Sequence, residues 1–337
     1  MFPAADAIIK WLLEGDPSIR WQVQRDLLDA PRKTWEAERA RVATKGWGAE
    51  LLKRQDRKGT WGGGIYSPKW KSTTYTLLLL RDMGLPPGNA AAVRGCRLIL
   101  DRALASKDDP TKLRDLSNAG CTCMMGMWLA LPAYFGVDDP KLAALAEHVL
   151  TQHMPDGGWN CRLGRRRHGP VHSSFHTTLN VLDGVREAIA RRIGPLKKLR
   201  EAEARAVELL LQHRLYKSDK TGRIIHRHFA RVSFPHRWHY DFLRGLDYIR
   251  TTPFIRDARL GDAFELLLSQ RRPDGRWPLG QTYGGEVFFN METPGQPSRW
   301  NTLRALRCMK ARGSRADDAP TTRARPLRAP PTLPRGA

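Results

Sequence analysis

Two histidines four residues apart, His172 and His176, have the spacing in this sequence that best suits chemistry. On a helix, positions i and i+4 lie on one face about one turn apart, so both rings can ligate one metal ion. Cys161 could add a thiolate and His239 or Asp241 a fourth ligand, and zinc is the ion that such a set favours. The alternative is a pair of structural histidines at a helix start, hydrogen-bonded to neighbouring loops.

A second sulfur-rich stretch contains Cys121 and Cys123, followed by Met124, Met125 and Met127. Two thiols this close together are candidates for a soft-metal site. Met and Cys at helical spacing, however, are more often adaptable core packing, which is the favoured interpretation.

A third pattern is Pro-x-Arg-Trp, which occurs at 235–238 and again at 297–300. Arg237 and Arg299 could clamp a diphosphate, because a guanidinium offers planar, paired donors to phosphate oxygens. The alternative, which we favour, is structural: each Arg stacks on a Trp and the motif belongs to a repeated unit.

The elements that must position these residues are repeats. A Gln followed by a turn and a Trp occurs three times, at 55–61, 152–159 and 270–277, each time before a helix-like run. The three tryptophans, Trp61, Trp159 and Trp277, recur at intervals of roughly 100 and 120 residues, and a degraded unit fits within each interval. A fixed period of this kind indicates units that bury their apolar faces against one another.

The Q…G-x-W element resembles the QW repeat of the squalene/hopene cyclases and of the protein prenyltransferase β subunits, over roughly Gly46 to Gly313. The resemblance implies an all-α fold, a single α/α toroid of about five helical hairpins around an apolar cavity. It also implies an isoprenoid or similar apolar small molecule as ligand. A fold of this kind hosts many chemistries, so the function must be argued from the site.

In the toroids that the chain resembles, the first turns of the inner helices face one mouth of the cavity. The implied catalytic residues are Asp241 and His239. The implied substrate-binding residues are Trp159, Arg237, Tyr240, Arg299, Trp300 and Asn301, and the implied metal ligands are Cys161, His172 and His176. The Asp-x-Cys element of prenyltransferases, the Asp-x-Asp-Asp acid of class II cyclases and the Asp-Asp-x-x-Asp cluster of ionising synthases are missing from the sequence. Asp241 is therefore the nominated acid or base.

Composition and charge set further limits on the 337 residues. The formal net charge is +23. The arginines of the chain lie among Ala, Leu and Glu at helical spacing, and we interpret them as parts of solvated helix faces. Contact with an anionic membrane surface is the alternative, and nucleic acid is a more distant one. No apolar run reaches the roughly 20 residues of a membrane-spanning helix. Five scattered cysteines and an N-terminus unlike a signal peptide predict reduced thiols and a cytoplasmic protein.

The repeats and the composition divide the chain into three predicted parts. Residues 1–45 are predicted as an N-terminal helical segment, with a helix starting at Asp16-Pro17, and 46–313 as the toroid. Residues 314–337 form a basic, Pro- and Arg-rich tail that is predicted to be disordered.

The function hypotheses are an enzyme acting on an isoprenoid-like substrate, a non-catalytic lipid- or peptide-binding toroid, and a basic repeat protein that binds nucleic acid. Loss of turnover in Asp241→Asn would separate the first from the second. A strong salt dependence of binding would support the third.

Overall fold

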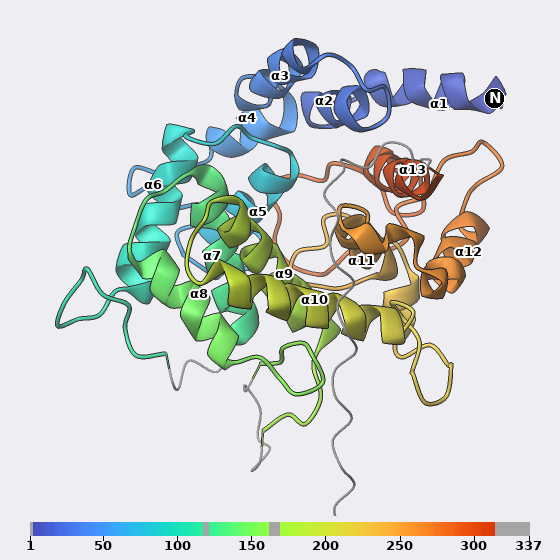
Figure 1. Ribbon diagram of the computed structural model, residues 1–337. Helices are drawn as coiled ribbons and strands as arrows, with labels where there is room; N and C mark the ends of the chain where they lie inside the picture. Colours follow the sequence, from blue (N-terminus) through green and yellow to red (C-terminus); the bar gives the residue numbers. More distant parts are fainter. Residues whose placement is uncertain (1–2, 117–120, 162–168, 314–337) are drawn as a thin grey trace, which may run out of the picture.

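The computed structural model describes residues 3–116, 121–161 and 169–313, and their fold is all-α (Figure 1). Extended segments in this part of the chain pair only at isolated bridges, such as Trp61 with Gly64, and form no sheet. The tail 314–337, predicted to be disordered, lies outside the described residues. None of the described helices is both long enough and apolar enough to cross a membrane.

Five helical hairpins form the ring. The outer helices are α4 (Gly46–Leu52), α6 (Ala90–Leu98), α8 (Lys141–Thr151), α10 (Leu196–Gln212) and α12 (Gly261–Ser269). Each is followed by an inner helix, and these are α5 (Thr73–Asp82), α7 (Thr122–Phe135), α9 (Phe175–Ala190), α11 (Phe242–Ile249) and α13 (Arg299–Gly313). Short 3-10 or π turns complete the connections at Arg41–Ala43, Ile99–Leu104, Arg227–Ala230, Pro253–Arg256 and Ala258–Leu260. The predicted all-α toroid of about five hairpins is confirmed.

Three N-terminal helices, α1 (Pro3–Leu13), α2 (Pro17–Asp26) and α3 (Arg32–Ala40), pack against the ring. As the sequence predicts, Asp16 caps α2 by accepting the amide N–H of Ser18, with Pro17 at the first helical position. On one side of α2, the indole N–H of Trp21 donates to the Met83 carbonyl at 2.8 Å. On the other side, Arg307 of α13 donates to the Gln22 side chain at 2.7 Å. Helix α2 therefore closes the ring between α5 and α13.

The three complete repeats are fastened by the same pair of hydrogen bonds around a buried tryptophan. The indole N–H of each Trp donates, at 2.7 Å, to a carbonyl in the last turn or turns of the outer helix. Its backbone N–H donates, at 3.0 to 3.1 Å, to a threonine hydroxyl on the inner helix. The sets are Trp61 with Leu51 and Thr73, Trp159 with Val149 and Thr178, and Trp277 with Leu267 and Thr302. Each Trp thus fixes how its outer and inner helices meet.

Two glycines let α7 and α9 approach each other closely. A Cβ at Gly126 would lie 2.5 Å from the Asn180 carbonyl oxygen, and one at Gly184 would lie 2.5 Å from the Gly126 carbonyl oxygen. Only glycine tolerates such an approach of backbone to backbone. This packing brings the start of α7 next to the start of α9, where the cysteine group described below lies.

Candidate functional site at one mouth of the ring

The mouth formed by the N-terminal turns of the inner helices is filled with aromatic rings. His239 stacks on Tyr283 with ring centroids 3.6 Å apart, and on Trp238 at 3.8 Å. Trp70 meets His239 edge-on at 5.9 Å and Tyr75 edge-on at 4.7 Å. Burial, followed by the nearby His176 and Arg244, lowers the pKa of His239 to about 3, so the ring is neutral near pH 7.

Asp241, the predicted acid or base, is fully buried and caps α11. One carboxylate oxygen accepts the Arg244 amide N–H at 2.8 Å, and the other accepts the amide and hydroxyl of Ser233. The structure thus gives this carboxylate a helix-capping role, and it lies outside the lining of the pocket described next. Catalysis by Asp241 and His239 stays a prediction.

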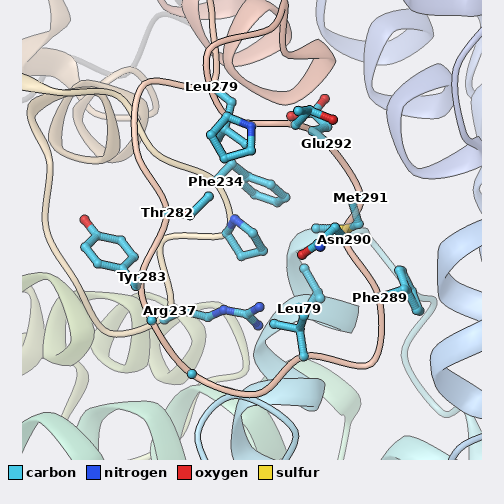
Figure 2. A pocket seen from close by; sticks show the side chains of 16 residues that line it. Leu79, Phe234, Arg237, Leu279, Thr282, Tyr283, Phe289, Asn290, Met291 and Glu292 are labelled. Carbon is cyan, nitrogen blue, oxygen red and sulfur yellow. The ribbon is translucent and has the colours of Figure 1, made fainter.

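A cavity of about 410 Å³ opens beside the aromatic rings, enclosed by the loop between α12 and α13 (Figure 2). Its wall is mixed. The apolar side chains are Leu79, Phe234, Pro235, Leu279, Val287, Phe289 and Met291, and Arg237, Thr282, Tyr283, Asn290, Glu292 and Thr293 are polar. The labelled residues from Leu279 to Glu292 run around it, and Arg237 extends into it. A site of this size falls within the usual range for small ligands, roughly 300 to 1,000 Å³.

Arg237 is the cation of this pocket. Its guanidinium lies 5.7 Å from the Trp70 ring centroid, and in the described part of the chain no carboxylate lies within ion-pair distance of it. Burial lowers the pKa of Arg237 to about 10, although Asp82 acts in the opposite direction. Its φ of +55° is a left-handed conformation that few arginines adopt. The side chain is half-buried, so its guanidinium donors stay accessible to an anion that enters the pocket.

Glu292 is a second ionisable group on the wall, and no motif in the sequence marks it. It accepts the amide N–H groups of Arg299 at 2.7 Å and Trp300 at 3.3 Å, and the Ser298 hydroxyl at 2.5 Å, so it covers the N-terminus of α13. Burial nevertheless raises the pKa of Glu292. It and Tyr283 come from an irregular loop with no periodicity that could mark them.

The other predicted substrate-binding residues lie around this pocket rather than in it. Trp300 stacks behind Phe234 at 4.1 Å, and Asn301 is buried and donates to the Pro278 carbonyl. Tyr240 is buried with its hydroxyl on the Leu215 carbonyl, and Trp159 fastens the third repeat. Arg299 lies over Trp11 of α1 at 4.5 Å and donates to its carbonyl, as the structural interpretation of the motif predicts. Of the six, only Arg237 lines the pocket.

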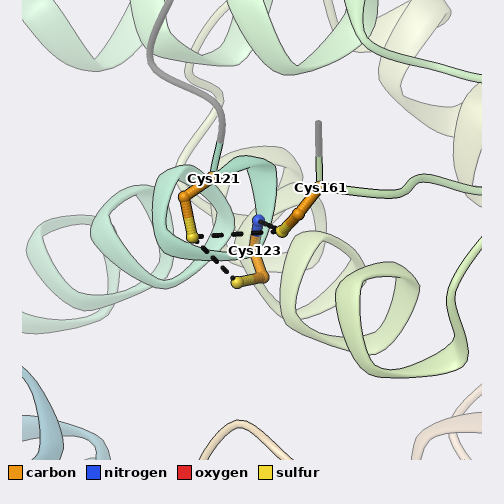
Figure 3. A group of neighbouring side chains, drawn as sticks. All are labelled: Cys121, Cys123 and Cys161. Atoms are coloured by element: carbon orange, nitrogen blue, oxygen red, sulfur yellow. Dashed lines mark hydrogen bonds between the residues drawn. The ribbon is translucent and has the colours of Figure 1, made fainter. Parts of the chain in front are cut away.

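The structure groups Cys161 with two other cysteines rather than with the two histidines (Figure 3). The Cys121 and Cys123 sulfurs are 3.3 Å apart, and the Cys161 and Cys121 sulfurs are 3.9 Å apart. The three sulfurs lie within 4.8 Å of one another, a group that could hold a metal ion. The favoured interpretation of Cys121 and Cys123 as packing alone misses this group, because it depends on the loop after Trp159 returning to the start of α7.

The two predicted histidine ligands lie elsewhere. Helix α9 begins at Phe175 with Ser174 as its cap, so His172 lies in the preceding loop, exposed, and does not share a helical face with His176. The Nδ1 atom of His176 accepts the Tyr240 amide N–H at 2.8 Å, which leaves the proton on Nε2. Burial, then Arg244, lowers the pKa of His176 to about 4.

The cysteine group favours one thiolate. Hydrogen bonds from the Cys121 and Cys123 thiols lower the pKa of Cys161, helped by the Thr177 hydroxyl and the Cys123 amide. That amide belongs to the first turn of α7, where helix N–H groups favour negative charge. The pKa values of Cys121 and Cys123 are raised. The neutral thiols of Cys121 and Cys123 therefore lie beside a Cys161 thiolate that can bind a metal ion.

Comparisons with known proteins give little beyond the fold. No protein-family model matches the chain, and no curated protein is significantly similar to it. A solved structure that resembles it is a variant of the type II terpene cyclase MstE from Scytonema, in complex with geranylgeranyl dihydroxybenzoate, its substrate. The TM-score is 0.43 at 16% identity, over 92% of this chain and 96% of that one.

Proposed function

We propose that this protein is prenyltransferase- or terpene-cyclase-like and takes an isoprenoid-type molecule with an anionic head group into the pocket at the mouth. The observation that carries the proposal is Arg237, a half-buried cation without a carboxylate partner among the described residues, in a pocket whose wall also has apolar side chains. An apolar chain would lie against Phe234, Phe289 and Met291, and its phosphate or carboxylate would pair with the guanidinium.

The aromatic rings support this ligand class. An unsaturated chain, or the positive charge that develops when one reacts, is attracted to the faces of Trp and Tyr rings, and Trp70, Trp238 and Tyr283 surround neutral His239 beside the pocket. The resemblance of the Q…G-x-W repeats points to the same class. If the protein is an enzyme, neutral His239 could accept a proton only from a strong acid such as a carbocation, because its pKa of about 3 makes it a weak base.

The experiment is calorimetric binding of farnesyl diphosphate. Arg237→Gln should weaken binding at least about tenfold, as expected for the loss of a charge-assisted contact. Arg299→Gln is the matched control, because that guanidinium lies over Trp11 and away from the pocket. Phe289→Ser should weaken the binding of farnesyl diphosphate and leave the binding of free diphosphate unchanged. Equal affinity in wild type and Arg237→Gln would refute the proposal.

Turnover separates the enzyme from a non-catalytic binding protein. Conversion of the bound isoprenoid that is lost in His239→Phe would establish catalysis. If binding depends on Arg237 but no product forms, the protein is the non-catalytic binding protein. Contact with an anionic membrane remains a subsidiary proposal, and nucleic acid is the least supported partner.

We also infer that Cys121, Cys123 and Cys161 bind a thiophilic metal ion, with zinc the first candidate. Three thiols within 4.8 Å of one another provide sulfur ligands of the kind that zinc binds at about 2.3 Å. This inference implies a reducing compartment such as the cytoplasm, where the thiols stay free.

Elemental mass spectrometry tests the metal site. About one ion per chain should be lost in Cys161→Ser and kept in His172→Asn and Cys96→Ser, since Cys96 is a buried thiol outside the group. Loss of the metal in His172→Asn would instead support the ligand set predicted from the sequence, Cys161 with His172 and His176. A metal-free wild type after purification with added zinc would exclude both sites.

A further inference from the structure

The end of the ring opposite the aromatic mouth contains a cavity of about 430 Å³ with a strongly charged wall. Eight arginines and four carboxylates line it, supplied mainly by α2, α3 and the inner helices α5, α9, α11 and α13. Two more carboxylates, Asp26 and Glu203, lie directly behind the wall and pair with Arg25 and Arg186. Cations still outnumber anions.

Two carboxylates of this wall are shared among several arginines. Asp183 pairs with Arg81 at 3.1 Å and with Arg244 at 2.8 Å. Asp247 pairs with Arg250 at 2.7 Å, and with Arg304 and Arg307. Because Asp183 and Asp247 each serve two or three guanidinium groups, N–H donors of these arginines remain for a further anion.

One arginine at the rim has no acidic partner. Arg39 of α3 donates to the Gly84 carbonyl at 2.7 Å and to the Tyr134 hydroxyl at 2.9 Å, and its guanidinium lies 5.2 Å from the Trp21 ring centroid. Within the residues that the structure describes, no carboxylate forms an ion pair with it. It is therefore a cation held at the cavity by neutral groups.

A buried histidine on the same wall also has an unused atom. His236 is 9% exposed, and its Nδ1 has no hydrogen-bond partner among the described residues. Its Nε2 lies 3.7 Å from Asp82, beyond hydrogen-bonding distance. Burial holds the pKa of His236 well below its usual value, so the ring is neutral and can carry its single proton on Nδ1 as a donor.

We infer that this cavity, which we call the arginine chamber, binds a small multivalent anion of the diphosphate class. Guanidinium groups match the paired oxygens of phosphate, and several of them in one enclosed space suit an anion with more than one charge. The C-terminal ends of α2 and α5 also lie here, and each carries about half a negative charge. Part of the excess positive charge of the arginines offsets these helix ends. The inference is independent of the Arg237 pocket.

The test is calorimetric titration with sodium diphosphate at constant ionic strength. Arg39→Gln should weaken binding about tenfold, because it removes one charge-assisted contact without unpairing a buried carboxylate. Arg32→Gln is the matched control: it makes the same charge change on the same helix, at an exposed position paired only with Glu36.

The outcomes separate the two anion sites. Diphosphate binding that is weakened by Arg39→Gln and unaffected by Arg32→Gln supports the arginine chamber, and a separate loss in Arg237→Gln reports the pocket at the mouth. Binding that depends on Arg237 but not on Arg39 places the anion at the mouth and overturns the inference. Absence of saturable binding in the millimolar range overturns it too, and the arginines then serve only the carboxylates and helix ends.

Discussion

The two ends of the helical ring are built from opposite chemistry on the same inner helices. At the mouth, His239 lies between aromatic rings, three cysteines cluster beside α7, and Arg237 lines the pocket without a carboxylate partner among the described residues. At the other end, Asp183 and Asp247 are each surrounded by arginines. The mouth has few charged side chains, and the other end has many.

The difference shows how each end is held together. The mouth depends on ring packing and on hydrogen bonds to backbone groups, which require neutral side chains such as His176. The arginine chamber depends on buried ion pairs, which are costly to break because one partner is then left charged without water. Substitutions at the two ends should therefore differ in size and in pH dependence.

The largest effect is expected at the chamber. Asp247→Asn leaves Arg250, Arg304 and Arg307 without their shared carboxylate and should lower the free energy of unfolding by about 3 to 5 kcal/mol. Asp262→Asn, which breaks a surface contact with Arg214 and Lys217, should cost less than about 1 kcal/mol. Urea unfolding at pH 7 compares them, and equal losses would contradict a chamber held by buried ion pairs.

The same carboxylate has a predictable pH dependence. Arg307, then Arg250 and Arg304, hold the pKa of Asp247 far below its usual value despite its burial. The stabilisation is thus present above the unfolded pKa, about 3.9, and disappears as pH falls below it. The gap between wild type and Asp247→Asn should narrow on acidification.

An intermediate effect is expected at the tryptophans of the repeats. Trp159→Phe removes the indole N–H and leaves the Val149 carbonyl with only the longer bond, 3.3 Å, from the Gln152 amide. Trp300→Phe removes the same atoms from an equally buried ring whose N–H has no partner among the described residues. Trp159→Phe should therefore be less stable by about 0.5 to 1.5 kcal/mol, read from unfolding midpoints. Identical losses would show that only ring volume matters.

The smallest effect concerns protonation at the mouth. Since the pKa of His176 is about 4 in the folded protein and about 6.5 when unfolded, its contribution is complete above pH 6.5 and declines as pH falls. Between pH 7 and 5.5 this should remove about 1 kcal/mol from the wild type. His176→Asn keeps an acceptor for the Tyr240 amide and should lose less. His172→Asn, at an exposed loop position, should follow the wild type, and a steeper slope in His176→Asn would contradict the argument.

Repetition made the fold predictable from the sequence. Trp61, Trp159 and Trp277 identify units whose hydrogen bonds are the same in the structure, so the pattern carried geometry as well as period. The Asp16 cap was likewise local and was correctly predicted. Arg237 could be nominated because it belongs to a repeated motif.

The rest of the site depends on contacts between distant segments. The grouping of Cys161 with Cys121 results from the close approach of α7 to α9, which single-chain spacing does not show. The interpretation of the arginines as solvated helix faces is wrong for Arg81, Arg244 and Arg307, whose side chains are at most 11% exposed. An arginine pattern suited to solvent also suits a ring interior, because carboxylates of the neighbouring inner helices take the place of water.

The closure of the ring by α2 has a consequence for biosynthesis. Gln22 and Asp26 leave the ribosome before their partner Arg307, which lies 285 and 281 residues later in the chain. The nascent chain must therefore keep Asp26, a buried carboxylate in the folded protein, hydrated until α13 has been synthesised. A chain that ends before α13 would leave Gln22 and Asp26 of α2 without their partner Arg307. Quality-control proteases can recognise such an incompletely closed ring.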